Sequence, residues 1–478
     1  MMSPAAESRT VMSARELSDR LCATAADEPV WVDEEETVSR QALHQEVTTC
    51  LDRLTAAGVR PGDCVAVQLV PGVTLFALLL AVWRADARAM LLDHRLTEAE
   101  TGSLTRLCPP EFHVRAAAGT TRFTERAELV IERLPGGFAF PEQVCLVQFT
   151  SGSTGRAKVV GRSAASLNAE IDRYAAIEDM PGPADRLLLL CSPIHTWGLI
   201  GGILYGLAAN LPLLFPSAQH GGAIARAAVT LEPTAIFGVA THFELLGKTA
   251  ELPRLPRLRV ATSAGMITSP EVAERFQQAT GCRLGQVYGM TEAGVVTADL
   301  TGRFPAPSVG RPAPGITVRA TGGELYVRLD ETPYLVDDGV ARFSGGWLRT
   351  FDRAAIDAAS GAVGILGRAD SVIAIGGIKI DLMEIEHVLR AHPDVTNAVV
   401  TFDSVIEAHV AARNGLTDRA LSAWSRERLN SLKAPKRYYL QEKLIETPTG
   451  KVIRDRAQLL SAFRERNAAV VHADRGDR

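Results

Sequence analysis

Apolar runs alternate with longer amphipathic or apolar stretches over the first two-thirds of the chain. Residues Cys64–Leu69 have the length and apolar content of a buried strand, and Leu75–Trp83 reads as a buried helix. Further strand-like runs occur at Ala89–Leu92, Arg186–Cys191 and Ala235–Val239. Strands that alternate with helices predict layered α/β architecture with parallel sheets.

The pattern changes towards the C-terminus. Residues Gly315–Thr350 contain short β-rich pieces divided by turns, and a compact tail follows Arg368. The tail predicts a helix at Leu382–Ala391 and strands at Ala398–Phe402 and Ala408–Ala412. It therefore predicts a separate C-terminal domain.

Bulk properties exclude several classes of protein. The chain has 478 residues, too many for one core, with 46% hydrophobic and 22% charged residues. A net charge of −4 gives no basic surface for nucleic acid, and the longest apolar stretch is too short for membrane insertion. The 7 cysteines lack the paired spacing of a zinc site or disulfide framework, and the charged N-terminal residues lack the apolar core expected of a signal peptide. We expect a cytoplasmic protein.

A glycine- and hydroxyl-rich loop follows the strand-like run Val144–Gln148. Glycines let backbone N–H groups converge on an anion, and a lysine adds a cation that reaches a phosphate. The spacing differs from the Gly-x-x-x-x-Gly-Lys-Ser/Thr loop, and a plain Ser/Gly-rich connector is the alternative. The residues of this candidate phosphate loop are Thr150, Ser151, Gly152, Ser153, Thr154, Gly155 and Lys158.

Three more motifs follow in order. Val287–Gly294 places one carboxylate, Glu292, beside glycines, and Trp347–Asp352 leads on to Gly367–Ile373. Thr447–Lys451 forms a Pro/Gly turn that ends in a lysine. Together with the loop, the four motifs are specific, although each alone is weak.

With these motifs the chain resembles the adenylate-forming superfamily: acyl- and aryl-CoA ligases, adenylation domains of peptide synthetases, and luciferases. The resemblance extends from about Thr37 to about Arg456. It implies a large N-terminal domain of layered α/β subdomains with a small β-barrel (1–369), which binds ATP and the acid. A smaller, mobile α+β domain (370–478) would carry the catalytic lysine.

The resemblance also implies site residues. Glu292 would be a magnesium ligand, with a helix-capping carboxylate as the alternative. Asp352 would accept hydrogen bonds from both ribose hydroxyls, and Arg368 would be a second ribose or phosphate ligand unless it forms a surface salt bridge. For Tyr288, packing in the core is the alternative to a binding role. Besides the phosphate loop, the implied ATP-binding residues are Gly265, Tyr288, Gly289, Met290, Thr291, Asp352 and Arg368.

The implied C-terminal residues concern domain motion. Lys451 would bridge the substrate carboxylate and the α-phosphate during adenylation. Asp370 would be the hinge about which the small domain rotates afterwards, opening a tunnel for a thiol. Gly376 and Gly377 would line that tunnel.

The segment Ser192–Gly198 resembles the Pro-x-x-His-x-x-Gly segment of CoA ligases, so His195, Trp197 and Gly198 would line the acid pocket. A satisfied core histidine is the alternative for His195. Peptide-synthetase domains for α-amino acids place an aspartate near here to pair with the ammonium. Its absence disfavours α-amino acids, because an unpaired buried ammonium is costly. We expect an aryl or a short- to medium-chain acid.

Two departures from the family pattern stand out. Phe351 occupies a position where glycine is usual. The end of the phosphate loop reads Ala157-Lys158-Val159 where the family has Pro-Lys-Gly. We expect Phe351 to tilt its loop or crowd the ribose. The loss of proline and glycine beside Lys158 should change the stiffness of the phosphate loop rather than inactivate the protein.

Three functions remain open. The first is an acid–thiol ligase that uses ATP and Mg²⁺ to form an acyl adenylate and passes the acyl group to CoA. The second stops at the adenylate and loads a carrier protein or another nucleophile, or activates a non-carboxylate such as nitrite. The third is an inert nucleotide-binding regulator, in which Lys451→Ala would change nothing.

Overall fold

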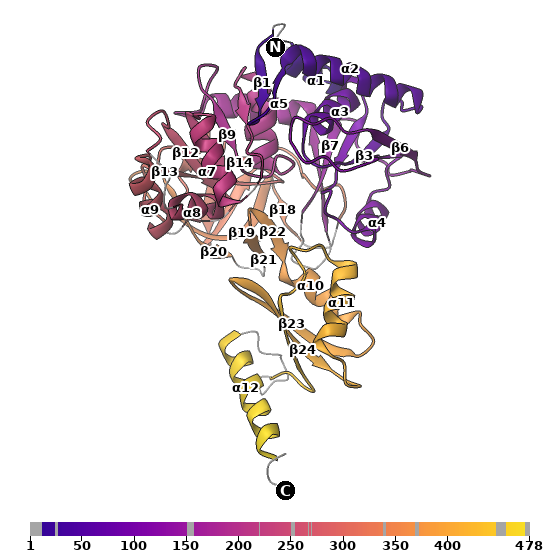
Figure 1. Ribbon diagram of the computed structural model, residues 1–478, viewed down its shortest axis with the longest axis vertical. Helices are drawn as coiled ribbons and strands as arrows, with labels where there is room; N and C mark the ends of the chain where they lie inside the picture. The colour runs from indigo at the N-terminus through magenta and orange to yellow at the C-terminus, as the bar shows by residue number, and fades with distance from the viewer. Residues whose placement is uncertain are drawn as a thin grey trace, which may run out of the picture.

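The computed structural model describes residues 12–23, 27–150, 157–218, 220–249, 254–265, 267–268, 270–337, 341–368, 372–445 and 456–473. Side chains are not described at 367, 368, 372 and 467–473. Figure 1 shows a large domain of sheets and helices with a smaller domain below it, and the chain ends at the far tip of the smaller domain. The predicted α/β class with two domains is confirmed.

One sheet of the large domain has nine strands. They are β1 (Pro29–Val32), β2 (Thr37–Ser39), β9 (Leu187–Leu189), β10 (Leu213–Leu214), β11 (Ala235–Gly238), β12 (Val260–Ala264), β13 (Leu284–Met290), β14 (Gly294–Asp299) and β15 (Arg311–Pro312). The order is β15-β14-β13-β12-β11-β9-β10-β1-β2. The strands from β13 to β1 in this order are parallel, and β2, β14 and β15 pair antiparallel at the two ends.

A second sheet has six strands in the order β6-β5-β3-β4-β7-β8. They span β3 (Cys64–Gln68), β4 (Arg88–Leu91), β5 (Phe112–Ala116), β6 (Leu129–Arg133), β7 (Val144–Thr150) and β8 (Lys158–Ser163). The inner four are parallel, and β6 and β8 are antiparallel edges. The predicted strands at Cys64–Leu69 and Ala89–Leu92 correspond to β3 and β4.

Helices fill the space between these sheets and cover their outer faces. The large-domain helices are α1 (Ala14–Cys22), α2 (Arg40–Ala56), α3 (Val73–Arg84), α4 (Glu98–Leu107), α5 (Ala164–Ala175), the π-helix η1 (Trp197–Leu204), α6 (Tyr205–Ala208), α7 (Gly221–Thr230), α8 (Ala240–Lys248) and α9 (Pro270–Thr280). Helix α3 is buried from Val73 to Trp83, as its apolar run predicts. The main core joins α3, α5 and η1 to both sheets, whereas α7, α8 and α9 cover the other face of the nine-stranded sheet.

A five-stranded antiparallel sheet forms a half-barrel where the β-rich segment predicts a small barrel. Its strands are β16 (Val318–Thr321), β17 (Glu324–Arg328), β18 (Phe343–Ser344), β19 (Trp347–Ile356) and β20 (Val363–Arg368). The predicted boundary at Asp370 comes directly after β20 and lies outside the described residues.

The small domain begins with a two-stranded hairpin and continues as an α+β unit with its own core. Its elements are β21 (Val372–Ile375), β22 (Ile378–Asp381), α10 (Leu382–Arg390), β23 (Val395–Asp403), β24 (Val405–Ala412), α11 (Asp418–Arg428), β25 (Arg437–Gln441) and α12 (Arg456–Ala473). Strands β23 and β24 are antiparallel, and β25 adds to them in parallel. No described helix is long and apolar enough to cross a membrane.

All seven cysteines have free thiols, and every one except Cys22 is buried. Burial raises the pKa of each thiol above its ordinary value. The pKa of Cys145, near the start of the strand β7 that leads to the candidate phosphate loop, rises to about 12. These thiols are therefore protonated at neutral pH.

Candidate functional site

The candidate phosphate loop joins two paired strands of the six-stranded sheet. Thr150 ends β7 and is paired with Lys158, the first residue of β8. The hydroxyl oxygen of Thr150 is buried and has no hydrogen-bond partner among the residues that the structure describes. A buried hydroxyl without a partner indicates a place where a ligand or water supplies one. Ser151, Gly152, Ser153, Thr154 and Gly155 lie outside the described residues.

Glu292 stands in the turn between β13 and β14 and is only 5% exposed. Its Oε1 lies 3.4 Å from Lys158 Nζ and accepts a hydrogen bond of 3.1 Å from the Tyr334 hydroxyl. Burial raises the pKa of Glu292, but the charges of Lys158 and Lys379 outweigh this effect and leave the pKa below its ordinary value. The structure thus brings two predicted residues, Glu292 and Lys158, together as a buried ion pair.

The oxygens around Glu292 suit a hard cation. Among the described residues, no group of three or more His, Cys, Asp or Glu side chains forms a metal cluster. Mg²⁺ needs only one or two protein carboxylates because it keeps several waters and binds substrate phosphates. The carboxylate of Glu292 and the unpartnered hydroxyl of Thr150 are donors of this kind. The residues present therefore fit the expected ion.

The other residues of the same motif pack tightly around the β13–β14 turn. Met290 is buried, and Thr291 lines a cavity described below. Gly289 has no room for a side chain, because a Cβ there would lie 2.6 Å from the carbonyl oxygen of Gly294. Glycine at position 289 therefore lets the backbones of β13 and β14 approach closely beside the turn that carries Glu292.

Tyr288 and Asp352 form a direct contact between the nine-stranded sheet and the half-barrel. The Tyr288 hydroxyl donates a 2.5 Å hydrogen bond to Asp352 Oδ2, and Asp352 is 5% exposed. The backbone of Asp352 is paired with that of Arg368, whose side chain is not described. Tyr288 is thus fixed by the predicted ribose ligand, and this contact is not evident from the sequence.

Phe351, which departs from the family pattern, adopts a backbone conformation suited to glycine. Its φ is +62°, in the left-handed region, which costs a non-glycine residue about 1 kcal/mol or more. The guanidinium of Arg349 lies 4.3 Å from the centre of the Phe351 ring. Phe351 thus holds a glycine-like backbone conformation within β19, and Arg349 lies over its ring.

The predicted acid-pocket residues lie where a strand end leads into the π-helix η1. The Trp197 ring stacks on Phe237 at 4.4 Å, and a Cβ on Gly198 would overlap the carbonyl oxygen of Ser192. His195 Nε2 is buried without a partner, and burial lowers the pKa of His195, so its ring is neutral at pH 7. Single π-helical turns are frequent at functional sites.

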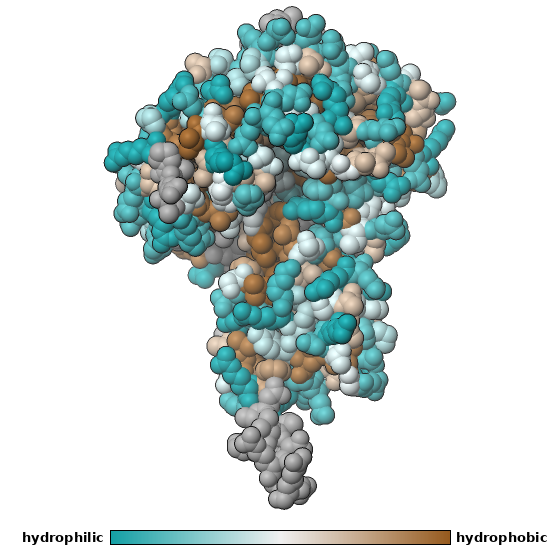
Figure 2. Space-filling model, in the orientation of Figure 1, coloured by the Kyte–Doolittle hydropathy of each residue, from teal (hydrophilic) through white to brown (hydrophobic). Residues whose placement is uncertain are grey.

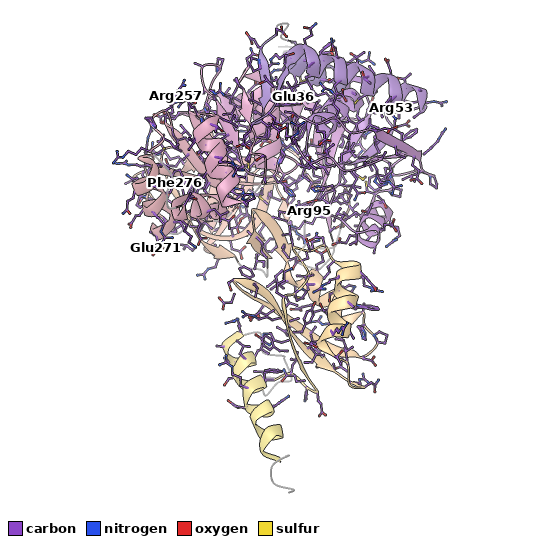
Figure 3. All side chains as sticks on the ribbon, viewed as in Figure 1. Glu36, Arg53, Arg95, Arg257, Glu271 and Phe276 are labelled. Carbon is purple, nitrogen blue, oxygen red and sulfur yellow. The ribbon has the colours of Figure 1, made fainter. Side chains whose placement is uncertain are left out.

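A cavity of about 560 Å³ lies between the two domains. Its large-domain wall combines apolar and polar side chains: Leu91, Leu92, Leu96, Leu104, Leu107, Asp93, Glu100, Ser103, Gln148, Thr150, His195 and Thr291. Its small-domain wall carries the carboxylate of Glu384 together with basic side chains from several elements: Lys379, His387, Arg428 and Lys433. Figure 2 shows hydrophobic side chains at the junction of the two domains, and Figure 3 places Arg95 at the adjoining rim of the large domain. Gln148 Oε1 is also buried without a partner among the described residues, so the wall of the cavity holds polar atoms that a ligand or water can engage.

The hairpin β21–β22 inserts its glycine turn against the large domain. A Cβ built on Gly265, a predicted ATP-binding residue, would lie 3.3 Å from the Cα of Gly377. Gly377 has φ +80°, and a Cβ there would overlap Val239 Cγ1, whereas Gly376 (φ +56°) has open space around it. The structure therefore brings a predicted ATP residue and a predicted tunnel residue into contact. Asp370 and Lys451 lie outside the described residues.

Several residues at this site are not evident from the sequence. Lys379 approaches from the small domain, and Tyr334 comes from the loop that precedes β18. Neither belongs to a motif with an obvious chemical signature. The alternation of Ile378, Lys379 and Ile380 on β22 is the one signal that marks Lys379 as facing away from the core.

Comparison with known proteins agrees with these motifs. The sequence profile of the AMP-binding enzyme family matches residues 18–328, and that of the AMP-binding enzyme C-terminal domain matches residues 384–451. The chain belongs to the AMP-binding enzyme family. The predicted membership of the adenylate-forming superfamily is thereby confirmed.

Relatives cover most of the chain at low identity. An oxalate–CoA ligase of Arabidopsis thaliana is 25% identical, over 86% of this chain and 91% of its own. A feruloyl-CoA synthase of Amycolatopsis is 27% identical, over the same shares. Among solved structures, an o-succinylbenzoate CoA synthetase of Bacillus subtilis has a TM-score of 0.79 at 22% identity, covering 93% of this chain and 98% of its own. An amide bond synthetase of Marinactinospora thermotolerans has a TM-score of 0.73 at 24% identity, covering 92% and 98%. These structural similarities concern the fold.

Proposed function

We propose that this AMP-binding enzyme is an acid–thiol ligase that activates an aryl or short- to medium-chain carboxylic acid and transfers it to CoA. In the first step a carboxylate oxygen attacks the α-phosphorus of ATP. The bond between that phosphorus and the bridging oxygen breaks, and pyrophosphate leaves. In the second step the thiol sulfur attacks the acyl carbon, AMP leaves with the broken C–O bond, and the thiol proton is released. The names of the relatives, several of them CoA ligases, support this reaction class.

The observation that carries the proposal is the docking of Gly377 against Gly265. It places a small-domain turn beside the nucleotide motif and closes a cavity that both domains line. That cavity is lined by many apolar side chains and by buried polar atoms of Thr150 and His195 that have no partner among the described residues. A pantetheine arm, with its methyl groups, amides and terminal thiol, matches this combination.

The residues of the large domain would hold the nucleotide. Lys158 would neutralise the outer phosphates together with the backbone of the phosphate loop. Asp352, fixed by Tyr288, would accept the ribose hydroxyls. A bound magnesium ion, held by Glu292 and the Thr150 hydroxyl, would supply further positive charge beside the phosphates. Preorganised charge of this kind lowers the barrier without reorganisation during the reaction.

The proposal requires a second orientation of the small domain for the first step. Helix α12, which begins shortly after Lys451, lies at the end of the small domain away from the large domain (Figure 1). We propose that rotation about Asp370 exchanges the hairpin for the segment that carries Lys451.

The class of acid follows from the charges near His195. Asp93, the carboxylate beside it, pairs with Arg95 at 2.5 Å. Burial raises the pKa of Asp93, but hydrogen bonds and the charge of Arg95 bring it down to about 2. Asp93 is thus already committed to a cation, and a neutral His195 offers no negative charge to an ammonium. An α-amino acid therefore remains disfavoured.

A second candidate acceptor is the pantetheine arm of a carrier protein. Two cations that line the cavity are already paired: Lys433 lies 2.7 Å from Glu384, and Arg428 lies 2.9 Å from Glu427. The 3′-phosphate of CoA would have to compete with these carboxylates, whereas a carrier-bound arm has no such phosphate.

Pyrophosphate release with ATP and magnesium tests the proposal against a panel of aryl, acyl, β-amino and α-amino acids and nitrite. Release that depends on an aryl or acyl acid and rises with CoA is the expected result. Acid-dependent release that is indifferent to CoA would favour the carrier protein or another nucleophile. Release unchanged in Lys451→Ala would contradict the catalytic role of that lysine, which should lower adenylation by orders of magnitude while ATP still binds. Bound ATP without release from any substrate would favour the inert regulator.

A further inference from the structure

A buried ion pair connects the strand after the phosphate loop to the turn that carries Glu292. Glu170, on α5, is 0% exposed, and its Oε2 accepts a 2.7 Å hydrogen bond from Arg162 Nη2 on β8. Its Oε1 accepts a 3.1 Å hydrogen bond from the backbone N–H of Val295, at the start of β14. One carboxylate thus joins three elements around the site.

The turn lies directly against this carboxylate. Gly294 has φ +74°, and a Cβ on it would overlap the carboxyl group of Glu170. Only glycine therefore fits between Glu170 and the turn. The position of the carboxylate fixes where the backbone of residues 292–295 runs.

Strand β8 reaches the same turn a second time. Lys158 and Arg162 share one face of β8, since alternate residues of a strand face the same side. Lys158 Nζ lies 3.4 Å from Glu292, and Arg162 reaches Val295 through Glu170. Arg162 is also held by Ser166, whose hydroxyl accepts a 3.0 Å hydrogen bond from Nε. The Glu292 turn is thereby attached to β8 at both of its ends.

We propose that Glu170, held by Arg162, is a positioning residue for Glu292. The pair fixes the backbone of the turn so that the Glu292 carboxylate faces the bound magnesium nucleotide. The inference rests on the proposed metal role of Glu292. A pair with a purely structural role would change the stability of the protein without changing its affinity for the magnesium nucleotide.

The first variant of the test replaces both members of the pair, so that no buried charge is left unpaired. In Arg162→Met/Glu170→Met the two buried charges are exchanged for apolar side chains of similar size, a change that often preserves folding. Glu170→Gln is the second variant; it keeps an oxygen acceptor for Val295 and loses the charge. Calorimetry measures Mg·ATP binding, and electron paramagnetic resonance measures Mn²⁺ binding in the presence of ATP. We expect both affinities to fall about tenfold, the lower end of the range for residues that support a metal ligand.

The small domain offers a matched control. Glu386 is also 0% exposed and accepts hydrogen bonds of 2.9 Å from both Arg390 and the backbone N–H of Val400. Glu386→Gln should lower the melting temperature to a similar extent and leave Mg·ATP affinity unchanged. If the folded Glu170 variants bind Mg·ATP with parental affinity while Glu292→Gln binds it more weakly, the inference is overturned and the metal role of Glu292 stands. Parental affinity in Glu292→Gln would overturn the metal role itself and the inference with it.

Discussion

Glu100 and Asn430 are joined across the two domains by a hydrogen bond of 3.1 Å from the backbone N–H of Asn430 to Glu100 Oε1. The other oxygen, Oε2, accepts from the backbone N–H of Thr97 and so caps α4. Lys433 Nζ lies 3.8 Å from the same Oε1. One buried carboxylate therefore both begins a helix of the large domain and receives the small domain.

Glu100→Gln should slow thiol transfer selectively. The change removes the charge that faces Lys433 and leaves one acceptor oxygen where the carboxylate uses two, Oε1 for Asn430 and Oε2 for Thr97. A loss of about 1 kcal/mol in the docked orientation corresponds to about fivefold slower transfer from a preformed acyl adenylate. Pyrophosphate formation, for which we propose the other orientation, should remain at the parental rate. Glu98→Gln, on the exposed side of the same helical turn, is the control. Equal slowing of both steps would contradict a role specific to docking.

Gly377→Ala should block transfer more strongly than Gly376→Ala. Both positions have positive φ, so both variants incur a similar backbone cost of about 1 kcal/mol. Only the Cβ at 377 would overlap Val239, because the space around 376 is open. We expect transfer to fall at least tenfold further in Gly377→Ala, as measured by single-turnover thioester formation. Similar rates in the two variants would mean that the contact with Val239 is not maintained during transfer.

Glu407→Gln should slow adenylation selectively. Glu407 is fully buried and accepts hydrogen bonds of 2.6 and 3.0 Å from Arg456 and of 2.8 Å from Arg437. Arg456 begins α12 shortly after Lys451, and its hydrogen bonds hold the pKa of Glu407 below its ordinary value. Loss of this charge-assisted anchor, of about 1–3 kcal/mol, should lower pyrophosphate exchange by about tenfold or more. Arg437→Gln, which spares Arg456, should have a smaller effect. Slower transfer from a preformed acyl adenylate would contradict the assignment to the first step.

Acid should destabilise the protein through His242, next to Val239. Burial lowers the pKa of His242 from the ordinary 6.5 to about 4, and its Nδ1 accepts a hydrogen bond from the Val239 N–H. The neutral ring is favoured in the folded state, whereas the unfolded chain binds a proton below pH 6.5. Stability is therefore fully present above pH 6.5 and falls as the pH drops to about 4, by about 3 kcal/mol in all.

Urea unfolding at pH 7 and pH 5 measures this effect. His242→Gln should flatten the dependence of the unfolding free energy on pH, whereas His44→Gln, at an exposed position, should leave it unchanged. An unchanged slope in His242→Gln would assign the acid sensitivity to other groups.

Local patterns predict much of the fold and the separate motifs that meet at the site. The run at Leu75–Trp83 is apolar on every side, and the structure buries it as α3 between the sheets. The motif around Glu292 and the strand before Lys158 likewise predict their elements, because apolar length and glycine position are local properties. The contact between Lys158 and Glu292 agrees with roles that the resemblance assigns separately.

The contacts that hold the site together are not predictable from the sequence in this way. Glu170 and Val295 are distant in the chain, and a glutamate within a helix has no local mark of burial. The hydrogen bond from Tyr288 to Asp352 depends on how the half-barrel packs against the nine-stranded sheet. For Phe351 the sequence predicts a tilted loop. In the structure the residue keeps the left-handed conformation that suits glycine, because the surrounding strand fixes it.

The burial of the cysteines has a consequence for chemical selectivity. An enzyme that hands an activated acyl group to a thiol must avoid acylating itself, and a thiolate is the side chain that reacts fastest. Cys191 ends the segment before the predicted acid pocket, yet it is buried and its pKa is raised by that burial. Burial raises the pKa of the other six thiols in the same way. An incoming thiol would therefore meet no competing thiolate from the protein itself.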